Sequence, residues 1–141
     1  YAIDGLHGHV IYWDAQRRTR RVIGGFNAGP GALETPVAFA LGPDAQLFVA
    51  DRSRNTIVVY DAFGRFLTTI ASGLAADAES LRFIDGSLWL ITPAAIQEVG
   101  TSGQLAGRWR VSLGAPLFVA ARHAEWTSLL TSERLYRMPS R

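Results

Sequence analysis

The stretch PVAFALGPDAQLFVADRSRNTIVVYDAFGRFLTTI, residues 36–70, decides the fold of this chain. It contains four short apolar runs, at residues 37–41, 47–51, 57–60 and 65–70. Between them lie a Gly-Pro-Asp turn, a short polar segment and an Ala-Phe-Gly turn. The runs are rich in Val, Ile, Phe and Tyr, which favour strands, and none has the period of a helix. The stretch therefore predicts four short strands joined by tight connections.

The rest of the chain repeats this pattern. Upstream, residues 1–4 align with 48–51 and residues 9–14 align with 56–61, while residues 20–24 take the place of the fourth strand. The strand positions of a third copy and a shorter fourth copy are 81–84, 87–92, 96–99 and 104–111, then 116–120, 127–131 and 135–138. The first copy lacks only its first strand, and the fourth copy stops near its third.

The spacing of the copies predicts the architecture. Asp4, Asp51, Thr92 and Thr131 end the second strand of successive copies, at intervals of 47, 41 and 39 residues. A period of about 40 residues built only of strands is typical of a β-propeller, with one four-stranded antiparallel sheet per blade. We therefore expect an all-β chain that forms a single propeller segment, a partial ring. The expected blades are 1–24 without its first strand, 36–71, 79–111, and an incomplete blade at 115–139.

The second copy resembles the NHL repeat. The resemblance rests on PVAFA at 36–40, LFVAD at 47–51 and IVVYD at 57–61, together with Asn55 and Gly64. It implies a six-bladed propeller in which the first and last blades complete one another. The remaining blades would then come from the same, longer polypeptide or from a second copy of this chain.

The composition is that of a globular domain, with 48% hydrophobic and 18% charged residues. All 14 basic residues are arginine, which a GC-rich genome produces, and the net charge is only +2. The absence of Cys excludes disulfides, thiolate metal sites and a cysteine nucleophile. No apolar run is long enough to predict a membrane span. Together with the NHL resemblance, this composition predicts a bacterial protein of the periplasm or the extracellular space.

Two aspartates are candidates for a metal site. Asp4 and Asp51 could belong to a ring of carboxylates that holds Ca²⁺ on one propeller face, as a resemblance to propeller lactonases and related hydrolases implies. Alternatively, each carboxylate accepts backbone N–H bonds at its own turn. The later copies carry Thr at this position, and a hydroxyl is a poor ligand for a hard cation. We therefore expect no cofactor, with Ca²⁺ as the alternative.

His7 and His9 are a second, weaker candidate for a metal site. Two imidazoles can bind Zn²⁺ or Fe²⁺ only with further ligands, and no carboxylate stands at a recognisable spacing. The chain has no Gly-x-Ser-x-Gly elbow, and the glycine-rich stretch 24–31 lacks the Lys of a phosphate loop. The sequence therefore predicts no catalytic residue.

Arginines dominate the candidates for partner binding. The densest cluster lies in the hairpin at residues 17–21, where it could bind phosphate or carboxylate groups or act only as a solvated edge that blocks strand addition. Two more arginines follow Asp51, on the opposite side of a propeller from that hairpin. Trp126 is included because Trp is enriched in binding hot spots. The full set is Arg17, Arg18, Arg20, Arg21, Arg52, Arg54 and Trp126.

The expected function is that of a non-enzymatic binding or scaffolding module that contacts a protein partner within a larger complex. Each repeat must first bury its own faces against its neighbours, so a repeat predicts architecture more directly than chemistry. A Ca²⁺-dependent propeller hydrolase or lactonase is the alternative. An RNA-binding NHL propeller is a third reading, although nucleic acid is not the expected partner. The segments where the copies differ, 17–21, 24–35 and 122–126, are the places to look for function.

Overall fold

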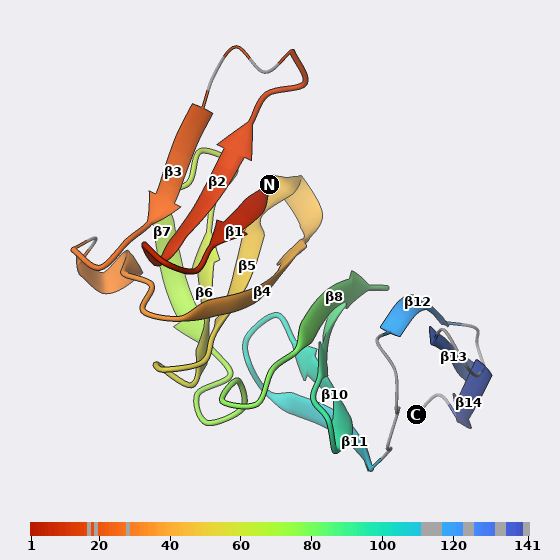
Figure 1. The fold of residues 1–141 in the computed structure, drawn as a ribbon. Coiled ribbons are helices and arrows are strands. Elements are labelled where there is room, and N and C mark those ends of the chain that lie inside the picture. Colours follow the sequence, from red (N-terminus) through yellow and green to blue (C-terminus); the bar gives the residue numbers. More distant parts are fainter. Residues whose placement is uncertain are drawn as a thin grey trace.

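The structure is a computed structural model that describes residues 1–16, 18, 20–27, 29–110, 117–122, 126–131 and 135–139. Its strands form four antiparallel sheets that follow one another along the chain (Figure 1). Within each sheet every strand pairs with its neighbours in sequence. This up-and-down order is that of propeller blades, so the expected all-β fold is confirmed.

The strands lie where the repeat pattern predicts them, to within one or two residues. The first sheet contains β1 (Ala2–Asp4), β2 (His9–Trp13) and β3 (Arg20–Gly24). The second contains β4 (Pro36–Leu41), β5 (Leu47–Asp51), β6 (Thr56–Tyr60) and β7 (Phe66–Ile70). The third contains β8 (Ser80–Ile84), β9 (Ser87–Ile91), β10 (Ala95–Gly100) and β11 (Leu105–Arg110). The fourth contains β12 (Leu117–Arg122), β13 (Trp126–Thr131) and β14 (Leu135–Pro139).

The middle strands of the second and third sheets are buried on both faces. β5 and β6 are buried along their whole length, as is β10. The last strands, β7 and β11, are mostly exposed. Continuous apolar runs thus form β5 and β6, whereas β10 also buries Gln97 and Glu98. Mixed runs form the outer strands β7 and β11.

Two clusters of apolar side chains join the first three sheets. One lies between the first and second sheets and contains Val10, Ile23, Val49, Val58 and Tyr60. The other lies between the second and third sheets and includes Phe48, Ile57, Val59, Leu88 and Leu90. Alternate residues of β6 therefore enter different clusters, as the period of a strand requires.

The crossover at residues 24–35 is fastened to the second sheet. It contains a 3₁₀ turn, η1 (Gly29–Gly31), which lies against β6 and β7. The Tyr60 hydroxyl donates to the Gly31 carbonyl at 2.6 Å, and the Arg54 guanidinium donates to the carbonyls of Pro30 and Ala32. The crossover between blades is therefore held by side chains of the blade that follows it.

The aromatic side chains are divided between core and surface. Tyr60 and Trp89 are buried, and Tyr60 belongs to the cluster between the first and second sheets. Trp109 stacks on Trp89 with ring centroids 5.4 Å apart, which makes it a packing residue. Trp13 occupies the repeat position of Tyr60, but it is 40% exposed because it lies on the face of the first sheet opposite Val10. No helix among the described residues has the length and apolar character needed to cross a membrane.

Candidate functional site

The carboxylate of Asp51 is buried and fully engaged by backbone. It accepts N–H bonds from Glu34 at 2.6 Å, from Thr35 at 3.2 Å and from Arg54 at 3.1 Å. Two of these donors belong to the crossover that precedes the blade, and one belongs to the turn that follows Asp51. Asp51 thus connects two loops of the second sheet, a structural role that leaves its oxygens committed to N–H donors.

The other turn residues follow the same principle. Asp61 accepts from the N–H groups of Phe63 and Arg65, both at 2.9 Å. The hydrogen bond from the Arg65 backbone is the largest cause that holds the pKa of Asp61 below its usual value. Asp14 accepts a hydrogen bond from the Arg18 N–H at 2.7 Å. The Thr92 hydroxyl donates to the Ala95 carbonyl and accepts from the Ala95 N–H, both at 3.0 Å. The Thr92 hydroxyl thus caps its turn at the repeat position where the first two copies carry Asp4 and Asp51.

Asp4 lies in the equivalent turn of the first sheet and contacts His7. Its Oδ2 is 2.9 Å from His7 Nδ1, and its Oδ1 accepts from the His7 N–H at 3.3 Å. The side-chain hydrogen bond from His7 is the main reason that the pKa of Asp4 is lowered. The spacing of the sequence indicates no carboxylate partner for the histidines, but the turn from Asp4 to His7 places the Asp4 carboxylate against His7.

The two histidines line a shallow hollow of about 380 Å³. Their rings are stacked, with centroids 5.8 Å apart. The rest of the lining comes from the start of the crossover and includes Gly25, Phe26 and Asn27. Across the described part of the chain, no group of three or more His, Cys, Asp or Glu residues is arranged to hold a metal ion. The arrangement is a carboxylate–imidazole pair beside an open hollow.

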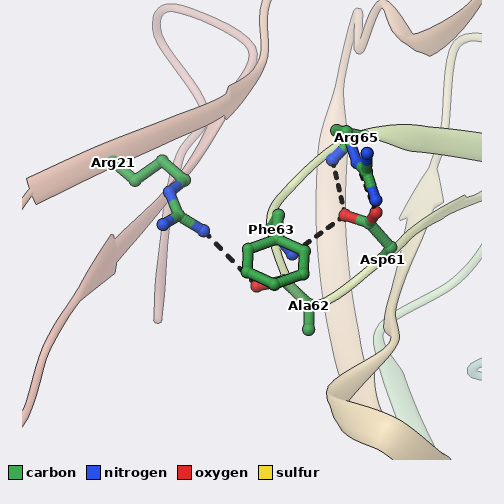
Figure 2. Close-up of polar contacts among 5 residues, drawn as sticks. All are labelled: Arg21, Asp61, Ala62, Phe63 and Arg65. Carbon is green, nitrogen blue, oxygen red and sulfur yellow. Dashed lines mark hydrogen bonds and ion pairs between the residues drawn. The ribbon is translucent and has the colours of Figure 1, made fainter.

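A second exposed feature lies where the first sheet meets the β6–β7 turn. The Arg21 guanidinium reaches from β3 to the Ala62 carbonyl at 3.4 Å and lies 5.6 Å from the centroid of the Tyr12 ring. Arg65 lies over the Phe63 ring at the same distance and pairs with Asp61 at 2.7 Å. Figure 2 shows Arg21 reaching this turn from the neighbouring sheet, with Asp61 and Arg65 joined across it.

The side chains of Tyr12, Arg21, Phe63 and Arg65 are called the rim patch below. Phe63 is 66% exposed although it is a large aromatic residue. Gly64 packs tightly under the turn, because a Cβ atom there would lie 2.7 Å from Ile23. The rim patch therefore presents an aromatic ring between two guanidinium groups on a turn that is fixed by hydrogen bonds and by packing.

The structure separates the predicted arginines. Arg21 belongs to the rim patch, and Arg20 is exposed on β3. Arg54 is turned toward the crossover, and Arg52 is exposed with a long bond of 3.4 Å to the Ala78 carbonyl. The backbone of Arg18 is bonded to Asp14.

Two predicted surfaces are described only in part. Trp126 is 46% exposed on β13. Arg17 and residues 123–125 lie outside the described residues. Phe63 and Arg65 were not among the residues predicted to bind a partner. A large aromatic residue inside a tight turn, between Ala62 and Gly64, was the signal that could have found them.

Comparison with known proteins supports the fold. No family model matches the chain, and no curated protein matches it. Among solved structures, U3-55K aligns with a TM-score of 0.66 and 14% identity over 94% of this chain and 46% of its own. Virginiamycin B lyase from Staphylococcus aureus aligns with a TM-score of 0.60 and 17% identity, over 94% of this chain and 49% of its own. YCF48 bound to D1 peptide aligns with a TM-score of 0.60 and 9% identity, over 95% of this chain and 47% of its own.

These neighbours have the propeller fold, and at this level of identity they show the fold alone. The chain is a β-propeller segment. It spans about half the length of these three solved structures. The neighbours include an enzyme and a protein with a bound peptide, so the shared fold does not select between catalysis and binding.

Proposed function

We propose that this propeller segment is a binding module that contacts an acidic segment of a protein partner through the rim patch. The observation that carries the proposal is the 66% exposure of Phe63 beside two arginines. Exposed aromatic and arginine side chains on a rigid support have the chemistry of binding hot spots. A guanidinium also binds carboxylates with matching geometry, which favours Asp and Glu in the partner.

The turn chemistry supports binding over catalysis. Asp51 and Asp61, the most conspicuous acidic residues of the second blade, are occupied by backbone donors. What the second blade offers to solvent at its turn is Phe63 and Arg65. A neighbour in the comparison, YCF48, is a propeller with a bound peptide, which gives a precedent for this kind of partner.

The experiment is a selection from a displayed library of random peptides against the purified chain. We expect enrichment of peptides that combine acidic and aromatic residues, and binding that weakens as salt rises, because charge pairs at a rim are screened. A selection that enriches no sequence, or enriches sequences whose binding is unchanged in Phe63→Ala and Arg21→Ala, contradicts the proposal.

The second candidate function is enzymatic, a Ca²⁺-dependent hydrolase or lactonase of the propeller type. The observation in its favour is the Asp4–His7 pair, which borders the hollow. A carboxylate that holds an imidazole by its Nδ1 is the arrangement of a general base and its positioning group. One neighbour, virginiamycin B lyase, is an enzyme with a catalytically inactive histidine-to-alanine variant. The Ca²⁺ measurement described in the Discussion tests this candidate.

RNA binding is the third candidate, and the arginines give it less support. Arg54 directs Nη1 of its guanidinium at two carbonyl groups of the crossover. Neutralising Arg52 and Arg20 should leave binding to a random RNA oligonucleotide unchanged. A salt-dependent loss of RNA binding in those variants would instead favour this function.

We also propose that the propeller is of the NHL type and acts in the periplasm or outside a bacterial cell. The repeat motif of the second blade supports the first statement, and the composition supports the second. Fractionation of the source cells with an antibody against this chain tests the location. Recovery in the cytoplasmic fraction contradicts it.

A further inference from the structure

The outer edge of the second sheet is free along β7. Among the described strands, β7 pairs only with β6, because it is the last strand in the order of its sheet. At the opposite edge, β4 lies beside β1 and β8 of the neighbouring sheets. The two faces of the second sheet are covered by the clusters that it shares with the first and third sheets. The free edge of β7 therefore lies in the middle of the chain, with a neighbouring sheet on either side.

β7 differs from the outer strands of the first and third sheets in what it offers to solvent. Its sequence, FLTTI, contains no charged residue, Gly or Pro, and its first four residues are exposed. The corresponding strands carry arginines, with RRVIG in β3 and LAGRWR in β11. Charged residues on an edge strand hinder the addition of another strand. The edge of β7 lacks this protection, so it is the outer edge best suited to strand addition.

A bulge at the start of β7 sets the length of the usable edge. Tyr60 pairs with Phe66 and Val59 pairs with Thr68, so Leu67 is an extra residue in β7. From Thr68 to Ile70 the pairing with β6 is regular. In a regular antiparallel strand, alternate residues direct their N–H and C=O groups away from the existing partner, where a further strand can bond them. The edge is short, so a segment that binds it needs contacts elsewhere as well.

The rim patch lies directly before this edge. Arg65 precedes Phe66, the first residue of β7, and its side chain is 77% exposed. The Asp61 N–H donates to the Arg65 carbonyl at 2.9 Å, which closes the turn where the strand begins. Gly31 of η1 packs on Phe66, because a Cβ atom at Gly31 would lie 2.8 Å from the Phe66 Cβ. The turn and the first residue of the strand are thus both fixed in place.

We propose that the partner segment that contacts the rim patch continues as an extended strand hydrogen-bonded to the free edge of β7. This inference rests on the proposed function, because it concerns the same acidic segment. All pairs within the second sheet are antiparallel, and the added strand runs antiparallel to β7 as well.

The direction of the added strand fixes the order of residues in the partner. Because Arg65 precedes β7, the acidic residues that lie beside Arg65 follow the strand-forming residues in the partner sequence. Thr68 and Thr69 are exposed on β7, and β-branched residues pair well across strands, so the strand-forming part should be rich in Thr, Val and Ile. The expected motif is therefore a short β-branched run followed by Asp or Glu.

The probe is the tightest acidic peptide from the displayed library. One derivative is made for each position of its β-branched run, with a single N-methylated residue, and the reversed sequence is the control for composition. In an added strand every second N–H bonds to β7. We therefore expect N-methylation to raise the Kd about tenfold at alternate positions and to leave it unchanged at the positions between. The reversed peptide should bind at least about tenfold more weakly.

Hydrogen exchange, followed by NMR on the isotope-labelled chain, locates the added strand. With saturating peptide, exchange of the β7 amides that do not bond to β6 should slow about tenfold or more. The amides of β11, the matched outer strand of the third sheet, should exchange as they do without peptide.

The outcomes separate this inference from the proposed function. A peptide that binds without slowing exchange in β7, or without the alternating effect of N-methylation, overturns strand addition and leaves the rim patch as the binding site. Slower exchange in β7 with a Kd that is unchanged in Phe63→Ala supports strand addition and contradicts the proposed function. Protection of β7 that rises with the concentration of the chain alone shows that a second copy occupies the edge, which overturns the inference. A library that yields no binding peptide contradicts both.

Discussion

Asp51 is the residue that joins the second blade to the crossover before it. Its oxygens receive three backbone N–H groups from two loops, and the side chain is fully buried. In Asp51→Ala these part-buried donors lose a charged acceptor, which should lower the free energy of unfolding by roughly 3 kcal/mol. Urea denaturation measures the change.

Asp77→Ala is the control for that substitution. Asp77 is exposed, so its removal should change the free energy of unfolding by less than about 0.5 kcal/mol. Equal losses in the two variants would show that Asp51 does not have the bridging role described here.

Tyr60 makes the stability of the chain depend on alkaline pH. Burial raises the pKa of Tyr60 above its ordinary value of 10.0. Above pH 10 the unfolded chain loses this proton while the folded chain keeps it, so the free energy of unfolding should fall as pH rises, with a slope of up to about 1.4 kcal/mol per pH unit. Denaturation at a series of pH values should show this slope in wild type and a smaller one in Tyr60→Phe. The same slope in both would contradict the assignment.

A turn role for Asp51 is one of the two alternatives that its sequence position predicts, but the position does not identify all of its partners. Asp61 is bonded within its own turn, at a spacing that local turn chemistry predicts. Asp51 instead takes two of its donors from Glu34 and Thr35, in a loop many positions earlier. Contacts of that kind depend on how the crossover folds back, which a repeat pattern alone does not specify.

At the scale of the elements, the β6–β7 turn is fixed by its contact with β3. Gly64 has a φ of +80°, and a Cβ atom there would lie 2.7 Å from Ile23. Gly64→Ala should therefore lower the free energy of unfolding by roughly 2 kcal/mol through backbone strain and the clash. The measurement is urea denaturation.

Gly73→Ala separates these two causes. Gly73 has a similar φ of +84° but no atom within 4 Å of the position of a Cβ atom. Gly73→Ala should therefore lower the free energy of unfolding only by the amount that comes from backbone strain. If Gly73→Ala is as destabilising as Gly64→Ala, the packing of the turn on β3 contributes nothing measurable.

The strands themselves were predictable because each is a short run of strand-forming residues bounded by turn residues. β5 was predicted with its observed bounds, and β11 differs by one residue at each end. The surface was harder to predict. Trp13 and Tyr60 occupy equivalent repeat positions, but only Tyr60 has a sheet packed against it. Exposure depends on the neighbour of a sheet, which the repeat unit does not encode.

At the scale of the whole molecule, Ca²⁺ distinguishes the two leading functions. A ligand that binds only the folded state raises its stability by mass action. Because Asp51 is occupied by backbone donors and Asp4 by His7, we expect the same Tm with Ca²⁺ and with EDTA. A Tm that rises by several degrees in Ca²⁺ would favour the hydrolase.

Binding through the rim patch is the central functional claim, and one comparison of affinities tests it. The probe is the tightest acidic peptide from the library, titrated against wild type, Phe63→Ala and Phe26→Ala. The two substitutions remove rings of similar exposure, 66% and 58%, from the rim patch and from the histidine hollow. We predict that Phe63→Ala raises the Kd about 30-fold and that Phe26→Ala leaves it unchanged. An unchanged Kd in Phe63→Ala, or a larger rise in Phe26→Ala, would contradict the claim.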